Sequence, residues 1–174
     1  MHSLPILIDE VQYAPELFSY IERDVKEIAD IDDTMLFSDL IRSAACRAGQ
    51  MLNISNIAQD VGISNDTAKR WLKILETSDI IFFLRPYSNN LLKRTIKTPK
   101  MCFYDTGHAA YLTRYSSPEI LANDAINGAI LENYVVSEII KTYHNNAKDC
   151  LLWHYRDTSR NEIDLVIESD GILH

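Results

Sequence analysis

A pair of short helical segments separated by a glycine turn is the feature that most restricts how this chain folds. Ser55 can cap a first helix that ends at the Gly62 turn, and Ser64 can cap a second helix that runs to about Thr77. Ala58 lies four residues before the glycine, as a helix-turn-helix requires, because a small residue permits a close helix crossing and glycine accepts the turn conformation. The sequence therefore predicts a helix-turn-helix.

The second helix of this motif is predicted to be amphipathic. Its apolar face is formed by Ala68, Trp71, Leu72 and Leu75, while its basic residues are Lys69, Arg70 and Lys73. Residues 80–84 are expected to form a strand, residues 86–90 a turn, and residues 91–96 and 101–104 further extended segments. A helix-turn-helix followed by a hairpin rich in basic residues is typical of a winged helix.

The charge of the chain changes sign along its length. The 174 residues carry a net charge of −8, but residues 61–115 carry +5, whereas residues 1–60 carry −7 and residues 116–174 carry −6. The overall acidity argues against indiscriminate binding of nucleic acid. The basic segment coincides with the predicted winged helix, which favours either a surface for a polyanion or attraction between neighbouring subdomains of opposite charge.

Composition excludes several other classes of protein. Hydrophobic residues make up 47% of the chain, enough to bury a core in one domain or two small ones. The apolar stretches are too short to span a bilayer, so we expect a cytoplasmic protein. The three cysteines, Cys46, Cys102 and Cys150, are scattered, so neither a disulfide framework nor a zinc ribbon is predicted. The five histidines show no metal-ligand spacing.

The segments on either side of the winged helix mix helical and alternating apolar patterns, so the predicted fold class is α/β (α+β). The flanking elements are helices at about residues 15–28, 34–48 and 124–143 and strands at residues 4–8, 150–155, 162–167 and 171–174.

The first of these strands ends in two carboxylates, Asp9 and Glu10. An apolar strand that ends in Asp-Glu is the pattern of a Walker B motif, in which the aspartate holds Mg²⁺ and the glutamate orients or deprotonates the attacking water. The alternative is a solvated strand end. No Gly-x-x-x-x-Gly-Lys-[Ser/Thr] segment occurs to cradle the phosphates of ATP. We therefore expect that this chain does not hydrolyse ATP by itself.

Several segments in order along the chain resemble a family of prokaryotic AAA+-like ATPases of unknown role. Ile6–Phe18 resembles their Walker B region, and Tyr20–Val25, Arg47–Gln50, Thr67–Leu72, Phe103–Gly107 and Asn161–Val166 resemble the domain of unknown function that follows the ATPase module. The resemblance implies three parts. Residues 1–18 are a remnant of the ATPase core, residues 19–105 carry helices and the winged helix, and residues 106–174 form a nuclease-like α/β unit that is incomplete at its C-terminus.

The last of these parts is similar to the first half of a PD-(D/E)xK nuclease. In that fold a helix glutamate, here Glu132, and a strand aspartate, here Asp164, gather Mg²⁺ together with a Glu-x-Lys on the next strand. Asp164 is accordingly a candidate metal ligand. The Glu-x-Lys is missing from this chain. The alternative is that both acids are partly buried structural residues, and we expect all four catalytic candidates, including Asp9 and Glu10, to be inactive here.

The function predicted from these patterns is a non-catalytic, DNA-binding or DNA-associated module that contacts duplex DNA through the winged helix. The candidate contact residues are Asn65, Lys69, Arg70, Lys73, Lys93, Arg94, Lys97 and Lys100. One alternative is an ATPase or Mg²⁺-dependent nuclease fragment, and another is a protein-interaction module that forms a homo-oligomer or binds a partner ATPase subunit. No membrane partner is expected. The resemblance implies ATP and Mg²⁺ as cofactors of longer relatives and none in this chain.

Overall fold

The fold is known from a computed structural model. It describes residues 23, 31, 33–87, 98–114, 126–148, 151–156, 161–169 and 172–174. The predicted strand at residues 4–8, the carboxylates Asp9 and Glu10, and the basic residues Lys93, Arg94 and Lys97 lie outside the described residues.

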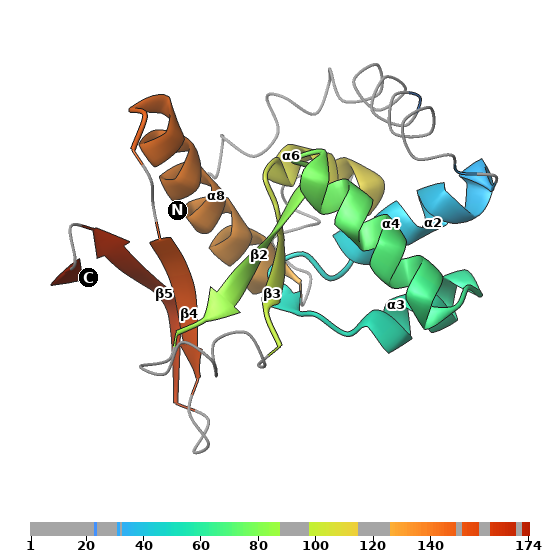
Figure 1. Ribbon diagram of the computed structural model, residues 1–174, viewed down its shortest axis with the longest axis horizontal. Helices are drawn as coiled ribbons and strands as arrows, with labels where there is room; N and C mark the ends of the chain where they lie inside the picture. Colours follow the sequence, from blue (N-terminus) through green and yellow to red (C-terminus); the bar gives the residue numbers. More distant parts are fainter. Residues whose placement is uncertain are drawn as a thin grey trace.

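The chain has an α+β fold, which confirms the predicted fold class (Figure 1). The helices are α2 (Thr34–Ala45), α3 (Ile54–Val61), α4 (Asn65–Thr77), α6 (Thr106–Leu112) and α8 (Asn127–Asn145). The strands are β1 (Gln50–Met51), β2 (Ile81–Pro86), β3 (Lys100–Phe103), β4 (Leu151–Arg156), β5 (Glu162–Ser169) and β6 (Ile172–Leu173). Within the described part of the chain, no helix is both long and apolar enough to cross a membrane.

The predicted helix-turn-helix is present as α3 and α4. The prediction that Ser64 caps the second helix is confirmed, since its side chain accepts a hydrogen bond from the Thr67 backbone. The cap predicted for the first helix was wrong by two residues. Asn53 takes this position and accepts from the Asn56 backbone. Gly62 ends this helix in the left-handed conformation, with φ of 78°.

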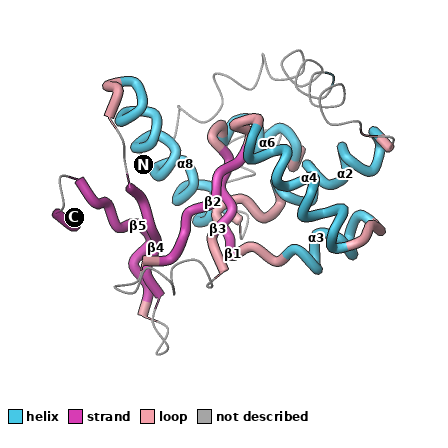
Figure 2. The backbone as a smooth tube through the Cα atoms, viewed as in Figure 1, coloured by secondary structure: helices cyan, strands magenta, loops and turns pink. Residues whose placement is uncertain are grey.

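The strands form one six-stranded sheet in the order β1-β3-β2-β4-β5-β6 (Figure 2). All neighbouring pairs are antiparallel except β2 and β4, which pair in parallel over Arg85 with Trp153 and Pro86 with His154. The Tyr87 backbone N–H extends this junction by donating to the His154 carbonyl at 2.6 Å. The sheet therefore runs without interruption from the helix-turn-helix region into the C-terminal strands.

Helices cover both faces of the central strands. Figure 1 shows α2, α3 and α4 on one side of β2 and β3 and α8 on the other. Met101 and Phe103 pack in the core formed with α2 to α4, whereas Cys102 packs in a second core with Val136 and Ile140 of α8. Because side chains alternate along a strand, β3 separates the two cores, and Lys100 points to the same side as Cys102, toward α8.

Two backbone contacts tie α8 to the rest of the fold. The Asn133 side chain accepts from the Phe103 backbone N–H and donates to the Phe103 carbonyl, both at 2.7 Å. Gly49 has φ of 75°, and a Cβ at this position would overlap the carbonyl oxygen of Ala129 and lie 2.9 Å from its carbonyl carbon. The first turns of α8 thus lie directly against β3 and the segment before β1.

Candidate functional site

The first candidate surface is the exposed side of α4, which contains four of the predicted contact residues. Asn65, Lys69, Arg70 and Lys73 are all exposed. The opposite side of the helix is buried, with Trp71 only 4% exposed and in edge-to-face contact with Phe37 at a centroid distance of 5.4 Å. The predicted amphipathic face of α4 is confirmed, and the helix is fixed by its apolar side.

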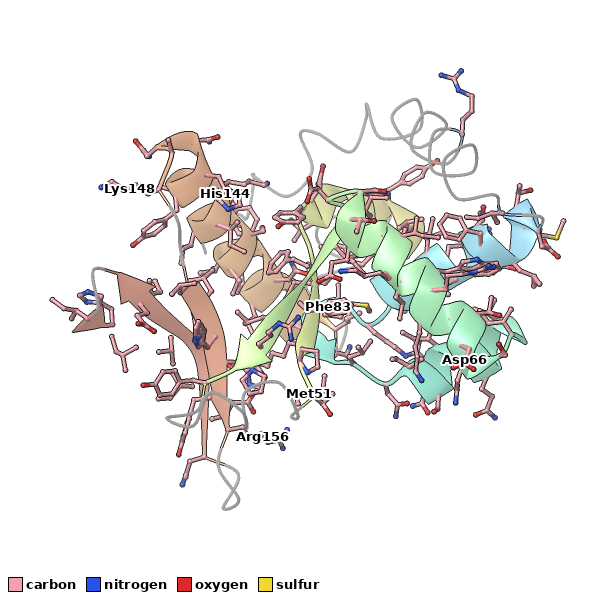
Figure 3. All side chains as sticks on the ribbon, viewed as in Figure 1. Met51, Asp66, Phe83, His144, Lys148 and Arg156 are labelled. Atoms are coloured by element: carbon pink, nitrogen blue, oxygen red, sulfur yellow. The ribbon has the colours of Figure 1, made fainter. Side chains whose placement is uncertain are left out.

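Acidic residues on α4 partly neutralise this basic surface. Lys69 lies 3.5 Å from Asp66, and Lys73 lies 2.8 Å from Glu76. Figure 3 shows Asp66 at the outer end of α4, away from the sheet. Among the described residues, no carboxylate lies within ion-pair distance of Arg70. Within the described part of the chain, Arg70 is therefore the α4 cation whose charge is least compensated.

The second candidate site is a cluster of one lysine and three carboxylates, which we call the Lys100 cluster. The Lys100 Nζ lies 2.6 Å from Glu132 Oε1, 2.9 Å from Glu162 Oε1 and 3.2 Å from Asp164 Oδ1. The lysine comes from β3, Glu132 from α8 and the other two from β5. The Lys100 side chain is only 5% exposed, whereas that of Asp164 is 66% exposed. The cluster is thus closed on the lysine side and open on the aspartate side.

An irregularity in β5 brings its two acids to the cluster. The pairing of β4 with β5 shifts register between Trp153 and Tyr155, so that three residue steps on β5 span two on β4. Regular alternation would place Asp164 and Leu165 on opposite faces of the sheet. Instead, Leu165 packs with the α8 core and Asp164 bonds to Lys100 on the same side. A β-bulge of this kind redirects side chains, and here it places Glu162 and Asp164 beside the lysine.

The electrostatics of the cluster keep Lys100 charged. Burial alone would lower the pKa of the Lys100 ammonium, but its hydrogen bonds and charge interactions with the three carboxylates outweigh burial and raise this pKa above the ordinary value. Burial raises the pKa of the Glu132 carboxyl, with Asp164 and Glu162 adding to the effect against the hydrogen bond from Lys100. Lys100 is consequently an ammonium ion throughout the physiological pH range.

Two neighbouring groups on the same side of the sheet are held neutral. Burial lowers the pKa of His154, and the positive charge of Lys100 lowers it further. Burial raises the pKa of the Cys102 thiol to about 12, with a smaller contribution from the negative charge of Glu132. At pH 7 the imidazole and the thiol are therefore both uncharged.

Lys100 requires a correction to the sequence interpretation. The sequence pattern predicts that Lys100 contacts DNA from an exposed wing. The structure places it at 4% exposure, paired with three carboxylates, so it is not available to a phosphate. Sequence pattern alone does not connect Lys100 or Glu162 with the two acids Glu132 and Asp164. A signal was present in the apolar residues 101–103 that follow Lys100, since they indicate a buried strand.

The structure does bring Glu132 and Asp164 together, because both contact the same ammonium group. They meet around a lysine cation rather than around an open position. In the described ranges, no three His, Cys, Asp or Glu side chains are arranged to hold a metal ion. In this arrangement the three carboxylates bind the Lys100 ammonium and thereby join β3, α8 and β5.

Fold and sites together define an α+β protein in which a helix-turn-helix and a C-terminal α/β unit share one sheet. The chain belongs to the family described as "Domain of unknown function (DUF8612)", whose model matches residues 9–119. A second model, "Domain of unknown function (DUF4143)", matches residues 127–174. The boundary between the two matches falls just before α8.

Two mycobacterial proteins are similar to this chain. They are "Uncharacterized protein Mb2031c" of Mycobacterium bovis and "Uncharacterized protein Rv2008c" of Mycobacterium tuberculosis. Each is 24% identical over 153 residues, which cover 88% of this chain and 34% of the relative. The chain thus spans about a third of the length of these relatives. No solved structure matches it.

Proposed function

We propose that this chain is a non-catalytic module that binds duplex DNA through the exposed side of α4. The observation that carries the proposal is the arrangement of this helix. Its apolar side is buried against α2, and Asn65, Lys69, Arg70 and Lys73 project from the other side. A second helix of a helix-turn-helix that is free on its polar side can enter the major groove, where its N-terminal residues contact base edges.

The order of elements supports the same proposal. From α2 the chain continues through β1, α3, α4, β2 and β3, and β1 pairs with β3, which in turn pairs with β2. A winged helix combines a helix-turn-helix with a small antiparallel sheet, so this order of elements supports the proposal that the chain contains one. The wing would be the connection between β2 and β3, which carries Lys93, Arg94 and Lys97. These three residues complete the proposed set of phosphate contacts, and Lys100 is omitted from it.

We further propose that the module belongs to AAA+-like ATPases. The resemblance of several segments to the domain that follows the ATPase in that family supports this assignment. In such proteins the module would direct an ATPase, with its ATP and Mg²⁺, to DNA.

Fluorescence anisotropy with a labelled duplex tests DNA binding. We expect binding at low salt that weakens as salt increases, and a loss of affinity in the Lys69→Ala, Arg70→Ala double variant. Lys141→Ala is the matched control, because Lys141 is a half-exposed helix lysine paired with a carboxylate three residues away, as Lys73 is. Absence of binding at low salt, or equal affinity of the double variant and the wild type, would refute the proposal.

A protein-interaction function is the second candidate, and an exposed apolar surface favours it. Leu151 and Leu173 are 50% and 46% exposed, and both align with Glu168 across β4, β5 and β6, so they lie on one face of the sheet. Ile163, paired with Tyr155, is 53% exposed on that face. Exposed apolar patches of this kind are typical of interaction surfaces.

Light scattering separates the two candidates. If this face forms an oligomer, Leu151→Lys should reduce the molar mass measured without DNA. Met35→Lys is the control, since Met35 is 76% exposed on α2 and lies outside this face. A monomer in the absence of DNA would argue against the second candidate.

A further inference from the structure

Carboxylates like the three of the Lys100 cluster are common ligands of divalent cations, but with Lys100 in place these three are not arranged to hold one. Glu132 from a helix and Glu162 and Asp164 from an adjacent strand direct oxygen atoms to one point. Mg²⁺ and related hard cations bind carboxylate oxygens, usually one or two together with water. The point at which these oxygens meet is occupied by the Lys100 Nζ.

The number of N–H donors on the Lys100 ammonium equals the number of carboxylates around it. A lysine ammonium has three N–H donors, and the three carboxylates each provide one acceptor oxygen, at 2.6, 2.9 and 3.2 Å. All three distances are hydrogen-bonding distances, and the two shorter ones are typical of charged pairs, whereas Mg²⁺ binds oxygen at about 2.0–2.1 Å. The ammonium and a metal ion cannot share this position, so the residues present do not fit a metal while Lys100 is in place.

The backbone of Lys100 also prevents the side chain from leaving easily. β3 is an inner strand of the sheet, and Lys100 is paired with Leu84 of β2 on one side and Met51 of β1 on the other. Cys102, two residues further along and on the same side, is 1% exposed in the core with α8. Removing the ammonium from the carboxylates would require a local opening of this sheet or a new exit for a side chain that is 95% buried.

We propose that Lys100 takes the place of a divalent cation, so that the cluster is a metal-free joint that fastens α8 and β5 to β3. In this protein the three carboxylates bind the Lys100 ammonium of β3, which belongs to the same part of the chain as the helix-turn-helix. The three acids carry two negative charges in excess of the lysine, and Asp164 and Glu162 face solvent at 66% and 33% exposure. Without the lysine these two side chains could close around an added cation together with Glu132.

The test is thermal unfolding of the full chain with and without Mg²⁺ or Mn²⁺. The wild type should show no change in Tm with either ion, and Lys100→Met should have a lower Tm that the ions raise. At a cation concentration ten times Kd, the rise for a chain of this size is roughly 3–6 °C. Lys100→Arg is the matched control, because it keeps a cation in the cluster and should not respond to the metal.

The ligand set is tested by a second substitution in the variant background. Asp164→Asn combined with Lys100→Met should abolish the metal-dependent rise in Tm, because it removes a carboxylate from the created site. If Lys100→Met fails to fold, titration calorimetry of the wild type with Mn²⁺ tests whether the intact cluster binds a metal ion. Binding that Glu132→Gln or Asp164→Asn abolishes would overturn the proposal, and no binding at the cluster would support it. Lack of any metal response in a folded Lys100→Met would also overturn it.

Discussion

The side-chain amide of Asn133 hydrogen-bonds to both backbone groups of Phe103, at 2.7 Å each. Phe103 is the last residue of β3, and Asn133 is completely buried on α8. The amide therefore acts as a replacement for a neighbouring strand, because it satisfies an N–H and a C=O that would otherwise be buried without partners. This contact joins the part of the chain matched by the first family model to the part matched by the second.

The first prediction concerns this amide. Asn133→Leu leaves two buried backbone groups unsatisfied at about 1–3 kcal/mol each, so we expect the free energy of unfolding to fall by roughly 2–6 kcal/mol. Urea denaturation measures the loss. Asn146→Ala is the control, because Asn146 is exposed and its side chain donates a hydrogen bond to the Thr142 carbonyl at the surface. A loss from Asn133→Leu no larger than that of the control would contradict this account.

The second prediction compares two glycines that share a left-handed backbone conformation. Gly49 and Gly62 have φ of 75° and 78°. A methyl group at Gly62 meets nothing within 4 Å, so Gly62→Ala should cost only the conformational term of about 1–2 kcal/mol. At Gly49 the methyl group also overlaps the Ala129 backbone, so Gly49→Ala should cost roughly 2–5 kcal/mol. Equal costs in chemical denaturation would show that α8 can move away from Gly49.

The third prediction concerns acid sensitivity. Burial, followed by the charge of Lys100, lowers the pKa of His154 below its ordinary value of 6.5. As the pH falls through this range, the unfolded chain takes up a proton that the folded protein does not, so stability is lost at up to about 1.4 kcal/mol per pH unit. The raised pKa of Glu132 acts in the opposite direction, because protonation of that carboxyl favours the folded state.

Stability measured between about pH 7 and 5.5 tests this assignment. The wild type should lose stability over this range, and His154→Leu should lose less. His144→Gln is the control, since His144 is exposed on the last turn of α8. If His154→Leu shows the same slope as the wild type, the acid sensitivity has another source.

The fourth prediction ranks the cations of α4 in DNA binding. Arg70 is the cation without a carboxylate partner among the described residues, whereas Lys73 is paired with Glu76 at 2.8 Å. Arg70→Ala should therefore weaken binding more than Lys73→Ala, and Glu76→Gln should strengthen it, because it frees Lys73 and removes a negative charge. Anisotropy titrations at several salt concentrations measure these changes. A larger loss from Lys73→Ala would assign the main contact to the other end of the helix.

Much of the helix-turn-helix could be predicted from the sequence because its determinants are local. Ser64 lies next to the helix it caps, Gly62 ends the preceding helix, and the buried residues of α4 recur at helical spacing. The position of the first cap was missed by two residues because Asn53 and Ser55 are both good capping residues. Sequence pattern does not show which of these two residues caps the helix. The structure shows that Asn53 does, because its side chain accepts a hydrogen bond from the Asn56 backbone N–H.

The partners of Lys100 could not be predicted in the same way. Glu132 and Asp164 are 32 and 64 residues away from it, and the contact depends on the parallel junction of β2 with β4 and on the β5 bulge. A lysine in a basic segment has the same local pattern whether it faces solvent or a carboxylate.

The sequence by itself determined the helix-turn-helix, the apolar side of α4 and the α+β class, because caps, turns and periodicity act over a few residues. The tertiary structure alone decided that Lys100 is buried in a cluster of acids. That outcome depends on which distant strands pair and which face each strand presents, and pairing of this kind is set by the packing of the whole fold.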